Sequence, residues 1–373
     1  MEFRQSRLEN LGIMKELKNT YFGKRVFVTG HTGFKGTWLI KILSDLGAII
    51  RGYALAPENE TNLYTQINGD SLCESVISDL RDRNALKNAV LDFQPDFIFH
   101  LAAQPLVRLS YEMPSETFEV NAIGTANLLD AIRLLNKKCN IVLITTDKVY
   151  HNNEWEQPYK ESDKLGGYDP YSASKACCEL IIDSYKNSFF NAVKYDYHNK
   201  AIAVGRAGNV IGGGDWSKDR LIPDIVKALH AKKQVVVRNP KAVRPWQHVV
   251  EPLFGYLELG DKLDSDPIKF AQAYNFGPNI NDALSVEEMV VMSINCWGAG
   301  TYNIEVNSNN PHEAGLLRLD ITKAINSLKW RPILNAQSAV ERTINWYKNF
   351  YNNAIATELM ELDIKYYQSK INE

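Results

Sequence analysis

The feature that most constrains the fold is segment 25–47, in which an apolar stretch meets three evenly spaced glycines. Residues 25–29, Arg-Val-Phe-Val-Thr, predict a short strand that runs directly into a glycine turn at 30–36. A helix is predicted next, because apolar residues recur at three- and four-residue intervals at Trp38, Leu39, Ile42, Leu43 and Leu46. Gly47 is a suitable left-handed terminator for this helix. Strand, glycine turn and amphipathic helix in this order indicate a dinucleotide-binding α/β domain.

Each glycine of the turn has a defined use when a pyrophosphate is bound. One permits the tight turn, one lets the backbone approach the anion, and one lets the helix approach the strand, while the helix N-terminus faces the negative charge. The spacing is G-x-x-G-x-x-G rather than G-x-G-x-x-G, but the flanking strand and helix favour a nucleotide site over an ordinary turn. We expect cofactor contacts from Gly30, Thr32, Gly33, Phe34, Lys35 and Gly36.

The second and third predicted strands leave the choice between NAD and NADP open. Strand 48–53 ends without the acidic residue that would bind the ribose 2′-hydroxyl of NAD, and Arg51 lies close by. Strand 75–78 leads to Asp79 and Leu80, which we expect at the adenine end of the cofactor. Asp82, just beyond them, is at least as well explained by a helix N-cap as by a cofactor contact.

Two further predicted strands complete an alternation of strands and helices. Residues 96–101 form a strand that ends in small side chains, and we expect cofactor contacts from Leu101, Ala102, Ala103 and Gln104. A helix follows at 115–136, where Asn121 is either a simple helix-interior polar residue or has a structural or proton-relay role. Strand 141–145 comes next. This alternation predicts a Rossmann-like, doubly wound parallel sheet.

Polar residues follow the most apolar of these strands. Thr146, Asp147 and Lys148 come directly after strand 141–145, and ligands bind beyond the carboxyl ends of such strands. An arbitrary Asp-Lys is most often a solvated loop pair. Tyr171 and Lys175 change that interpretation, because they lie four residues apart on one face of the helix that follows this strand. Chance supplies about two such pairs in this composition, so position rather than spacing supports the pair.

The Tyr171–Lys175 pair suits proton transfer from a sugar hydroxyl. An ordinary tyrosine is almost wholly protonated at neutral pH. The ammonium of Lys175 and a positively charged nicotinamide would both favour the phenolate. Tyr171 would then be a usable base.

Composition excludes several classes of protein. A net charge of −2, from 42 basic and 44 acidic residues, argues against a general nucleic-acid or membrane-surface binder. The 5 cysteines form neither a metal-ligand spacing nor an even disulfide framework, so we expect no metal site and a reducing compartment. Residues 1–20 lack the apolar core of a signal peptide, and no apolar run could cross a bilayer. We therefore expect a soluble, cytoplasmic protein.

With these elements in place, the chain resembles the extended short-chain dehydrogenase/reductase family, in its NAD-dependent epimerase/dehydratase group, from about residue 23 to about residue 347. The glycine turn and the Tyr–Lys pair mark only the superfamily. A narrower likeness, to nucleotide-sugar 4,6-dehydratases, rests on Thr146-Asp147-Lys148 and on segments 166–171, 206–216, 219–224 and 244–248. In the similar dTDP-glucose dehydratases the third residue of the Thr-Asp-Lys trio is usually Glu.

The resemblance implies bound NAD, CDP-glucose as substrate and a set of roles. Tyr171 would take the proton of the sugar C4 hydroxyl, with Thr146 and Lys175 orienting the phenolate, and Tyr171 and Lys175 would also contact the cofactor. Lys148 would remove the C5 proton while Asp147 protonates the departing C6 hydroxyl. The implied substrate contacts are Gln104, Asn209, Arg220, Arg244, His248 and His312.

The resemblance also implies an assembly and a pathway. Family members pair through the helices that follow Ser115 and Tyr171, which implies a homodimer. The product would serve deoxysugar and surface-polysaccharide (O-antigen) synthesis. Cytosine as the base is implied by the resemblance alone.

The expected fold has two interleaved parts. We assign residues 21–205 and about 246–270 to the NAD-binding domain, and about 206–245 and 271–350 to a smaller nucleotide-sugar-binding lobe. Residues 1–20 are an N-terminal extension and 351–373 a C-terminal tail.

Other functions stay open. The chain can be another nucleotide-sugar 4,6-dehydratase, or a 4-epimerase, which needs the Tyr–Lys pair and NAD but no acid–base pair at C5 and C6. It can also be a cofactor-binding scaffold without catalysis. Asp147 and Lys148 argue against the epimerase, and the intact Tyr171 and Lys175 argue against the scaffold.

Overall fold

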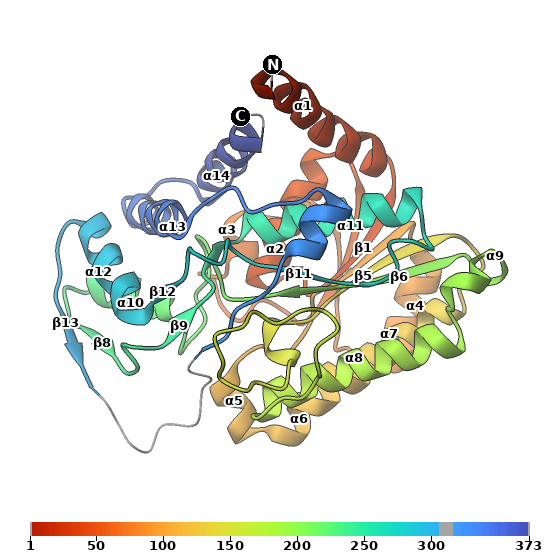
Figure 1. The fold of residues 1–373 in the computed structure, drawn as a ribbon, viewed down its shortest axis with the longest axis horizontal. Helices are drawn as coiled ribbons and strands as arrows, with labels where there is room; N and C mark the ends of the chain where they lie inside the picture. Colours follow the sequence, from red (N-terminus) through yellow and green to blue (C-terminus); the bar gives the residue numbers. More distant parts are fainter. Residues whose placement is uncertain (1, 306–315, 372–373) are drawn as a thin grey trace.

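The computed structural model describes residues 2–305 and 316–371, and a seven-stranded parallel sheet forms its centre (Figure 1). The strand order is β11-β6-β5-β4-β1-β2-β3, and all neighbours are parallel. The strands are β1 Arg25–Thr29, β2 Ile49–Ala54, β3 Glu74–Ile77, β4 Phe97–His100, β5 Cys139–Ile144, β6 Lys200–Ala207 and β11 Ala273–Phe276. The chain winds outward from β1 to β3 and returns at β4, so the β1/β4 boundary is the switch point where such sheets bind ligands. The predicted doubly wound sheet is confirmed.

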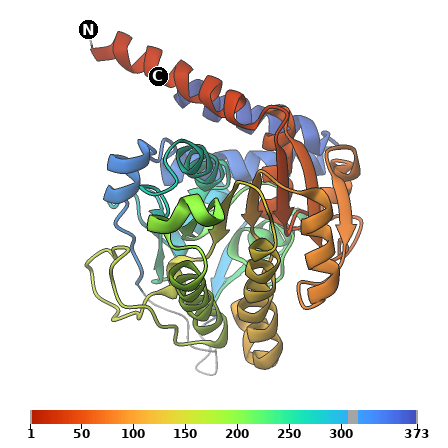
Figure 2. The ribbon, with the colours of Figure 1, turned by 90° about the vertical axis from the view of Figure 1, so that its right-hand side faces the viewer.

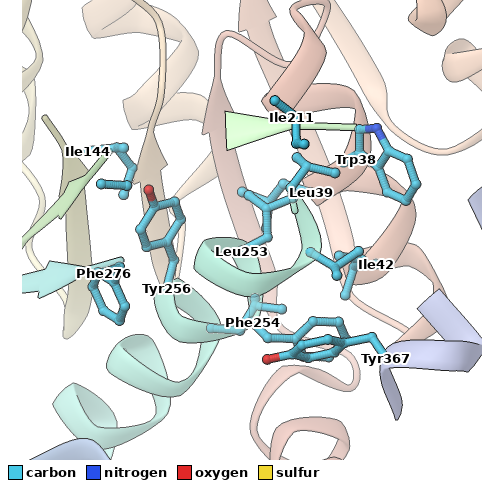
Figure 3. Close-up of a cluster of buried hydrophobic side chains, with 14 of the residues drawn as sticks. Trp38, Leu39, Ile42, Ile144, Ile211, Leu253, Phe254, Tyr256, Phe276 and Tyr367 are labelled. Carbon is cyan, nitrogen blue, oxygen red and sulfur yellow. The ribbon is translucent and has the colours of Figure 1, made fainter. Parts of the chain in front are cut away.

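Both faces of the sheet are buried by helices. Along β1, Val26 and Val28 join the apolar cluster of one face, and Phe27 joins that of the other. The Phe27 face packs against α4 (Arg83–Phe93), α7 (Gly124–Arg133) and α8 (Pro170–Ser188). The opposite face packs against α2 (Phe34–Asp45) and α11 (Val250–Ser265), whose side chains meet in Figure 3. Burial on both faces explains why β5 is apolar along most of its length.

Among the described residues, the smaller lobe includes three short strand pairs and two helices, and one of these strands, Gln247–His248, falls in the range 246–270 that we assigned to the NAD-binding domain. The pairs are β7 Val210–Ile211 with β10 Gln247–His248, β8 Val235–Val237 with β13 Tyr302–Ile304, and β9 Val243–Arg244 with β12 Leu284–Ser285. The helices are α10 Leu221–His230 and α12 Val286–Trp297. Strand β11 lies within the range 271–350 that we assigned to this lobe, yet it pairs with β6 and so belongs to the main sheet.

The helix predicted at 115–136 is interrupted. It consists of α6 (Pro114–Phe118), a π-helical turn at Glu119–Ile123 and α7. Asn121 lies in that turn, where its carboxamide accepts from Gln104 N at 2.8 Å and donates to Gln104 O at 3.1 Å and Ser174 Oγ at 2.8 Å. The side chain therefore joins the loop after β4 to α8, and it has a structural role. The remaining short helices are α3 Leu63–Gln66, α5 Val107–Glu112 and α9 Tyr195–His198.

The two terminal segments both form helices. The N-terminal extension is α1 (Glu2–Tyr21), and the segment expected as a tail includes α14 (Ala356–Ile371), which follows α13 (Ala336–Tyr351). Figure 2 shows α1 along the top of the molecule with the blue C-terminal helices beside it. Lys41 of α2 is 3.2 Å from Glu361, an ion pair that joins α14 to the first helix of the domain. In the part of the chain that the structure describes, no helix combines the length and apolar character needed to cross a membrane.

A buried acid in α11 makes the stability of the fold depend on pH. The side chain of Glu251 is buried and accepts the N–H of Ile333 at 2.9 Å, and burial raises its pKa to about 8. Since this value lies above that of an unfolded glutamate, the stability that the protonated acid contributes is fully present below about pH 4.3 and is lost as pH rises toward 8. We expect wild type to lose on the order of 2–4 kcal/mol relative to Glu251→Gln between pH 5 and pH 8.

This expectation is checked by urea unfolding of both proteins at the two pH values. Glu358→Gln, at an exposed position in α14, is the control and should follow wild type. Parallel pH profiles for wild type and Glu251→Gln would contradict the role of this carboxyl group.

Candidate active site

The tip of β5 brings an acid and an ammonium group together. Residues Asp147–Val149 form a 3₁₀ turn capped by Thr146, whose hydroxyl donates to Asp147 Oδ1 at 2.9 Å. Lys148 Nζ lies 3.6 Å from Asp147 Oδ1 and donates to Asn209 Oδ1 at 3.3 Å. The Asp147 side chain is 1% exposed and that of Lys148 is 24% exposed. Asp147 and Lys148, which we expect to be catalytic, are therefore not a fully solvated loop pair.

Helix α8 presents Tyr171 and Lys175 to this tip. Asp169 caps the helix by accepting the N–H of Ser172 at 2.9 Å, and proline occupies the first helical position. Lys175 Nζ donates to the carbonyl oxygen of Ile144, the last residue of β5, at 3.2 Å. The predicted shared face of Tyr171 and Lys175 thus meets the end of the central strand.

The surroundings of Tyr171 act on its pKa in opposite directions. Burial raises the pKa of Tyr171, a hydrogen bond with Thr146 lowers it, the negative charge of Asp147 raises it and the positive charge of Arg220 lowers it. Arg220 is therefore a cation near the phenol of Tyr171. We expected Arg220 as a substrate contact and did not include it among the catalytic residues. Burial also lowers the pKa of Lys175, and Cys178 and Glu179 oppose that effect.

The glycine turn is shaped for a close ligand. Gly30 has φ +77°, and a Cβ there would lie 2.7 Å from Ala102 N. A Cβ on Gly36 would lie 1.9 Å from Gly30 O, so the helix approaches the strand as closely as the motif predicts. Gly33 is the N-cap of α2 and offers no side-chain cap. The first N–H groups of α2 have no acceptor within the helix, and they fit an anion such as a pyrophosphate.

Lys35 adds an amine whose pKa lies near neutral pH. Burial and the positive charges of Arg220 and Lys175 lower the pKa of Lys35 to about 7. Its Nζ is 3.4 Å from the hydroxyl of Tyr256 in α11. A bound dianion would restore the charge of this ammonium.

The other expected cofactor residues lie along the same edge of the sheet. The Thr32 hydroxyl donates to Leu55 O at 2.9 Å, and Asp79 is paired with Arg81 at 2.6 Å. Asp82 accepts from the N–H of residues 84 and 85 and caps α4, so the helix-cap interpretation is correct.

The residues after β3 and β4 are held by neighbouring elements. Leu80 is buried against Gly124. A Cβ added to Gly124 would lie 3.0 Å from the Cβ of Leu80. Ala102 N donates to Thr29 Oγ1 at 3.2 Å, which places Leu101, Ala102 and Ala103 beside the glycine turn. The Gln104 side chain donates to Thr117 Oγ1 of α6 at 2.9 Å.

Arg51, in the second strand, has two acidic partners. Its guanidinium lies 2.7 Å from carboxylate oxygens of both Glu74 and Asp92, so it is committed to ion pairs.

The expected substrate residues have different surroundings in the structure. Asn209 contacts Lys148, and Arg220 is paired with Asp215 at 2.8 Å and faces Tyr171. Arg244 lies in β9, 8% exposed. His248 has no exposed surface, packs edge-on against the Trp38 ring and lies 3.6 Å from Asp363 of α14. The substrate contact expected from His248 stays a prediction, and its ring is buried between Trp38 and Asp363 of α14. His312 lies outside the described residues.

Two residues of the site were missed from the sequence. Glu179 and Arg206 form a buried ion pair directly behind the tip of β5, with Nε to Oε1 at 2.8 Å. Glu179 continues the face of Tyr171 and Lys175 by one more turn, and an arginine inside the apolar strand 200–207 needs a buried counter-ion. Together these two signals could have predicted the pair.

A parallel sheet with a glycine turn at β1, a Tyr–Lys pair on α8 and a polar trio at the tip of β5 defines an extended short-chain dehydrogenase/reductase. Comparison with known proteins identifies the family within this class. The chain belongs to the family described as GDP-mannose 4,6 dehydratase, which matches residues 27–343.

Curated and solved proteins agree with that placement. The CDP-glucose 4,6-dehydratase of Salmonella typhimurium is 47% identical over 331 residues, which cover 89% of this chain and 92% of that protein. DesIV, a dTDP-glucose 4,6-dehydratase from Streptomyces venezuelae solved with NAD bound, superposes with a TM-score of 0.76 at 22% identity over 89% of this chain and 99% of its own. The epimerase Mth375 of Methanothermobacter thermautotrophicus gives 0.77 at 22% identity over 91% and 96%. The two solved structures share the fold.

Proposed function

We propose that this protein is a CDP-glucose 4,6-dehydratase, which converts CDP-glucose to CDP-4-keto-6-deoxyglucose and water with NAD as its resident cofactor. The observation that carries the proposal is the buried Asp147 beside Lys148, at a strand tip that also meets Tyr171. An acid and a base next to a Tyr–Lys pair are what a dehydration needs beyond sugar oxidation. The 47% identity to a CDP-glucose 4,6-dehydratase supports the substrate.

The residues of the glycine turn fit NAD. The unsatisfied N–H groups at the start of α2 and the ammonium of Lys35 suit the pyrophosphate, and Gly30, Thr32, Gly33, Phe34 and Gly36 line the approach. Asp79, Leu80, Leu101, Ala102, Ala103 and Gln104 would hold the rest of the cofactor, with Tyr171 and Lys175 at its reactive end. When bound, NAD accepts a hydride from C4 of the sugar and returns it to C6.

Replacing Gly36 by alanine is expected to abolish retention of NAD and to lower the free energy of unfolding by about 1–3 kcal/mol. The added methyl would overlap Gly30 O at 1.9 Å and push α2 away from the glycine turn. NAD released from purified, denatured protein is measured for wild type and variant. The matched control is Gly12→Ala in α1, where the nearest atom to the new Cβ is 3.9 Å away. Full NAD content in Gly36→Ala would contradict the assignment.

Proton transfer begins at Tyr171. Its phenolate takes the proton of the C4 hydroxyl as the C4–H bond breaks, leaving a ketone at C4. The positive charge of Arg220 and a hydrogen bond with Thr146 both lower the pKa of Tyr171 and so favour the phenolate. Lys175, which donates to the carbonyl oxygen of Ile144, would help Thr146 to orient it.

The ketone acidifies C5–H, and the Asp147–Lys148 pair completes the elimination. The Lys148 amine takes the C5 proton while the Asp147 carboxyl group protonates the C6 hydroxyl, which leaves as water. The two side chains lie 3.6 Å apart, so they can act on neighbouring carbon atoms of one sugar.

The nucleoside diphosphate needs cations, and the smaller lobe would supply them. Arg220 and Arg244 would bind the two phosphates with Asn209 beside them, since guanidinium groups bind such oxygens in a bidentate manner. Gln104 and His312 remain proposed substrate contacts.

Assembly, compartment and pathway belong to the same proposal. Exposed apolar side chains on the helices after Ser115 and Tyr171, such as Ile123 and Leu180, support a homodimer through that face. A reducing cytoplasm suits the five free cysteines. The product would serve deoxysugar and O-antigen synthesis.

The test is mass spectrometry of CDP-, dTDP-, UDP- and GDP-glucose after incubation with purified protein, with and without added NAD. We expect loss of one water from CDP-glucose alone, also without added NAD. Loss of water from another nucleotide sugar would overturn the base assignment. An isomer of unchanged mass would identify an epimerase, and no reaction with any substrate would favour a non-catalytic scaffold.

A further inference from the structure

A buried ion pair joins α8 to β6 beside the tip of β5, where residues 146–148 lie. Arg206 lies in β6 and Glu179 in α8, with Nε to Oε1 at 2.8 Å and Nη2 to Oε2 at 2.9 Å. Both side chains are 5% exposed. Apolar residues of similar volume often replace such a pair without loss of stability, so stability alone is a weak reason for its presence.

The carboxylate of Glu179 holds α8 against the residue that precedes the trio. Glu179 follows Lys175 by one helical turn and Tyr171 by two, on the same face. Its Oε1 also accepts a hydrogen bond from Thr145 Oγ1 at 2.6 Å. Thr145 directly precedes Thr146, so one carboxylate sets the distance between the Tyr–Lys face and the start of the trio.

The guanidinium of Arg206 reaches the other end of the trio. Its Nη1 donates to the hydroxyl of Tyr150 at 2.9 Å and to the carbonyl oxygen of Glu161 at 3.1 Å. Tyr150 OH in turn donates to Asn275 Oδ1 at 2.7 Å in β11. Tyr150 follows Lys148 by two residues, so the ion pair is bonded to the chain immediately before and shortly after residues 146–148.

We propose that Glu179 and Arg206 are positioning residues, which hold Thr146, Asp147 and Lys148 in register with Tyr171 and Lys175. The inference rests on the proposed function. Dehydration needs groups at C4, C5 and C6 of one hexose at the same time, and a misplacement of about 1 Å can reduce such a rate on the order of 10²-fold. Residues 146–148 are themselves a short turn, and their geometry depends on what holds their two ends.

Charge gives the pair a second effect, on Lys175. Burial lowers the pKa of Lys175, and Glu179 and Cys178 on its own helix raise it. His100 of β4 and Lys35 of α2 also interact electrostatically with Lys175. Removing the charge of Glu179 should therefore let Lys175 lose its proton at lower pH.

The test replaces the ion pair by uncharged side chains of similar length, in Glu179→Met/Arg206→Met. The matched control is Arg342→Met/Asp363→Leu, which removes an ion pair of 2.6 Å between α13 and α14. Both variants should keep the circular dichroism spectrum of wild type. We expect kcat to fall about 100-fold in the first, with KM within about threefold of wild type, and to stay unchanged in the control.

Two single variants separate positioning from folding. Thr145→Val removes only the hydroxyl that joins β5 to Glu179, and it should lower kcat about tenfold with an unchanged melting temperature. Glu179→Gln should move the alkaline limb of the kcat profile to lower pH. A wild-type kcat in the double variant and in Thr145→Val, beside active wild type, would overturn the positioning role alone. Absence of dehydration by wild type itself would overturn the proposed function and this inference together.

Discussion

Replacement of Tyr171 by phenylalanine is expected to lower kcat for dehydration by about 10³-fold while the protein stays folded and retains its cofactor. Tyr171 is buried at the tip of β5 and hydrogen-bonded with Thr146. Phenylalanine keeps the packing of the ring and removes only the oxygen that we propose takes the C4 proton. KM should change within about threefold, because the interaction that is lost acts in the transition state.

The matched control for this variant is Tyr185→Phe, the same change on the same helix. The Tyr185 hydroxyl lies 3.0 Å from Asp130, on the side of α8 that faces α7, and its removal should leave kcat unchanged. Both variants are assayed by steady-state kinetics with product mass. A Tyr171→Phe enzyme within about tenfold of wild type would remove Tyr171 from the proton transfer.

Separate replacement of Asp147 and Lys148 is expected to stop the reaction at two different points. Lys148→Met should lose exchange of the C5 hydrogen with deuterated solvent, because no amine is left to take that proton. Asp147→Asn should keep the exchange but fail to expel the C6 hydroxyl. Each change should lower product formation by about 10²–10⁴-fold, the usual contribution of a general acid or base.

Reduced cofactor and C5 deuterium content are the two measurements, followed by absorbance and by mass spectrometry. Both variants still oxidise C4, so both should accumulate reduced cofactor that wild type does not. Lys160→Met, at an exposed lysine in the loop after the trio, is the control and should behave as wild type. Undiminished C5 exchange in Lys148→Met would place the base elsewhere.

The double variant Asp147→Asn/Lys148→Met should be little worse than either single variant. The two groups lie 3.6 Å apart and would act on the same elimination, so their effects should not be additive. Losses that multiply would show two independent roles.

The first nucleotide-binding element could be predicted almost residue by residue. The strand expected at 25–29 is β1 Arg25–Thr29, the helix begins at Phe34, and Gly47 has φ +80° as its terminating position requires. These features depend on hydrophobic period and turn chemistry within a few neighbouring residues. The meeting of the β5 tip with Tyr171 and Lys175 was also predictable, because parallel strands present their carboxyl ends at one edge of the sheet.

Other features depended on partners that no local pattern specifies. The π turn at Asn121 exists because its carboxamide bonds to Gln104 and Ser174, in two other elements. The burial of His248 beside Asp363 joins residues that are far apart in the sequence. A strand as short as Ala273–Phe276 could be placed in either lobe until its pairing with β6 was known.

Hydrophobic period, turn chemistry and the order of strands and helices were therefore sufficient for the sheet, the glycine turn and the location of the chemical groups. Those signals act over a few residues, and a chain of this kind has few ways to pack them. Only the tertiary structure decided which polar residues face the site and which support it, as with Glu179 and Arg206 behind the tip. Burial and ion pairing between residues distant in sequence are properties of the packed molecule, because each side chain's surroundings are supplied by the others.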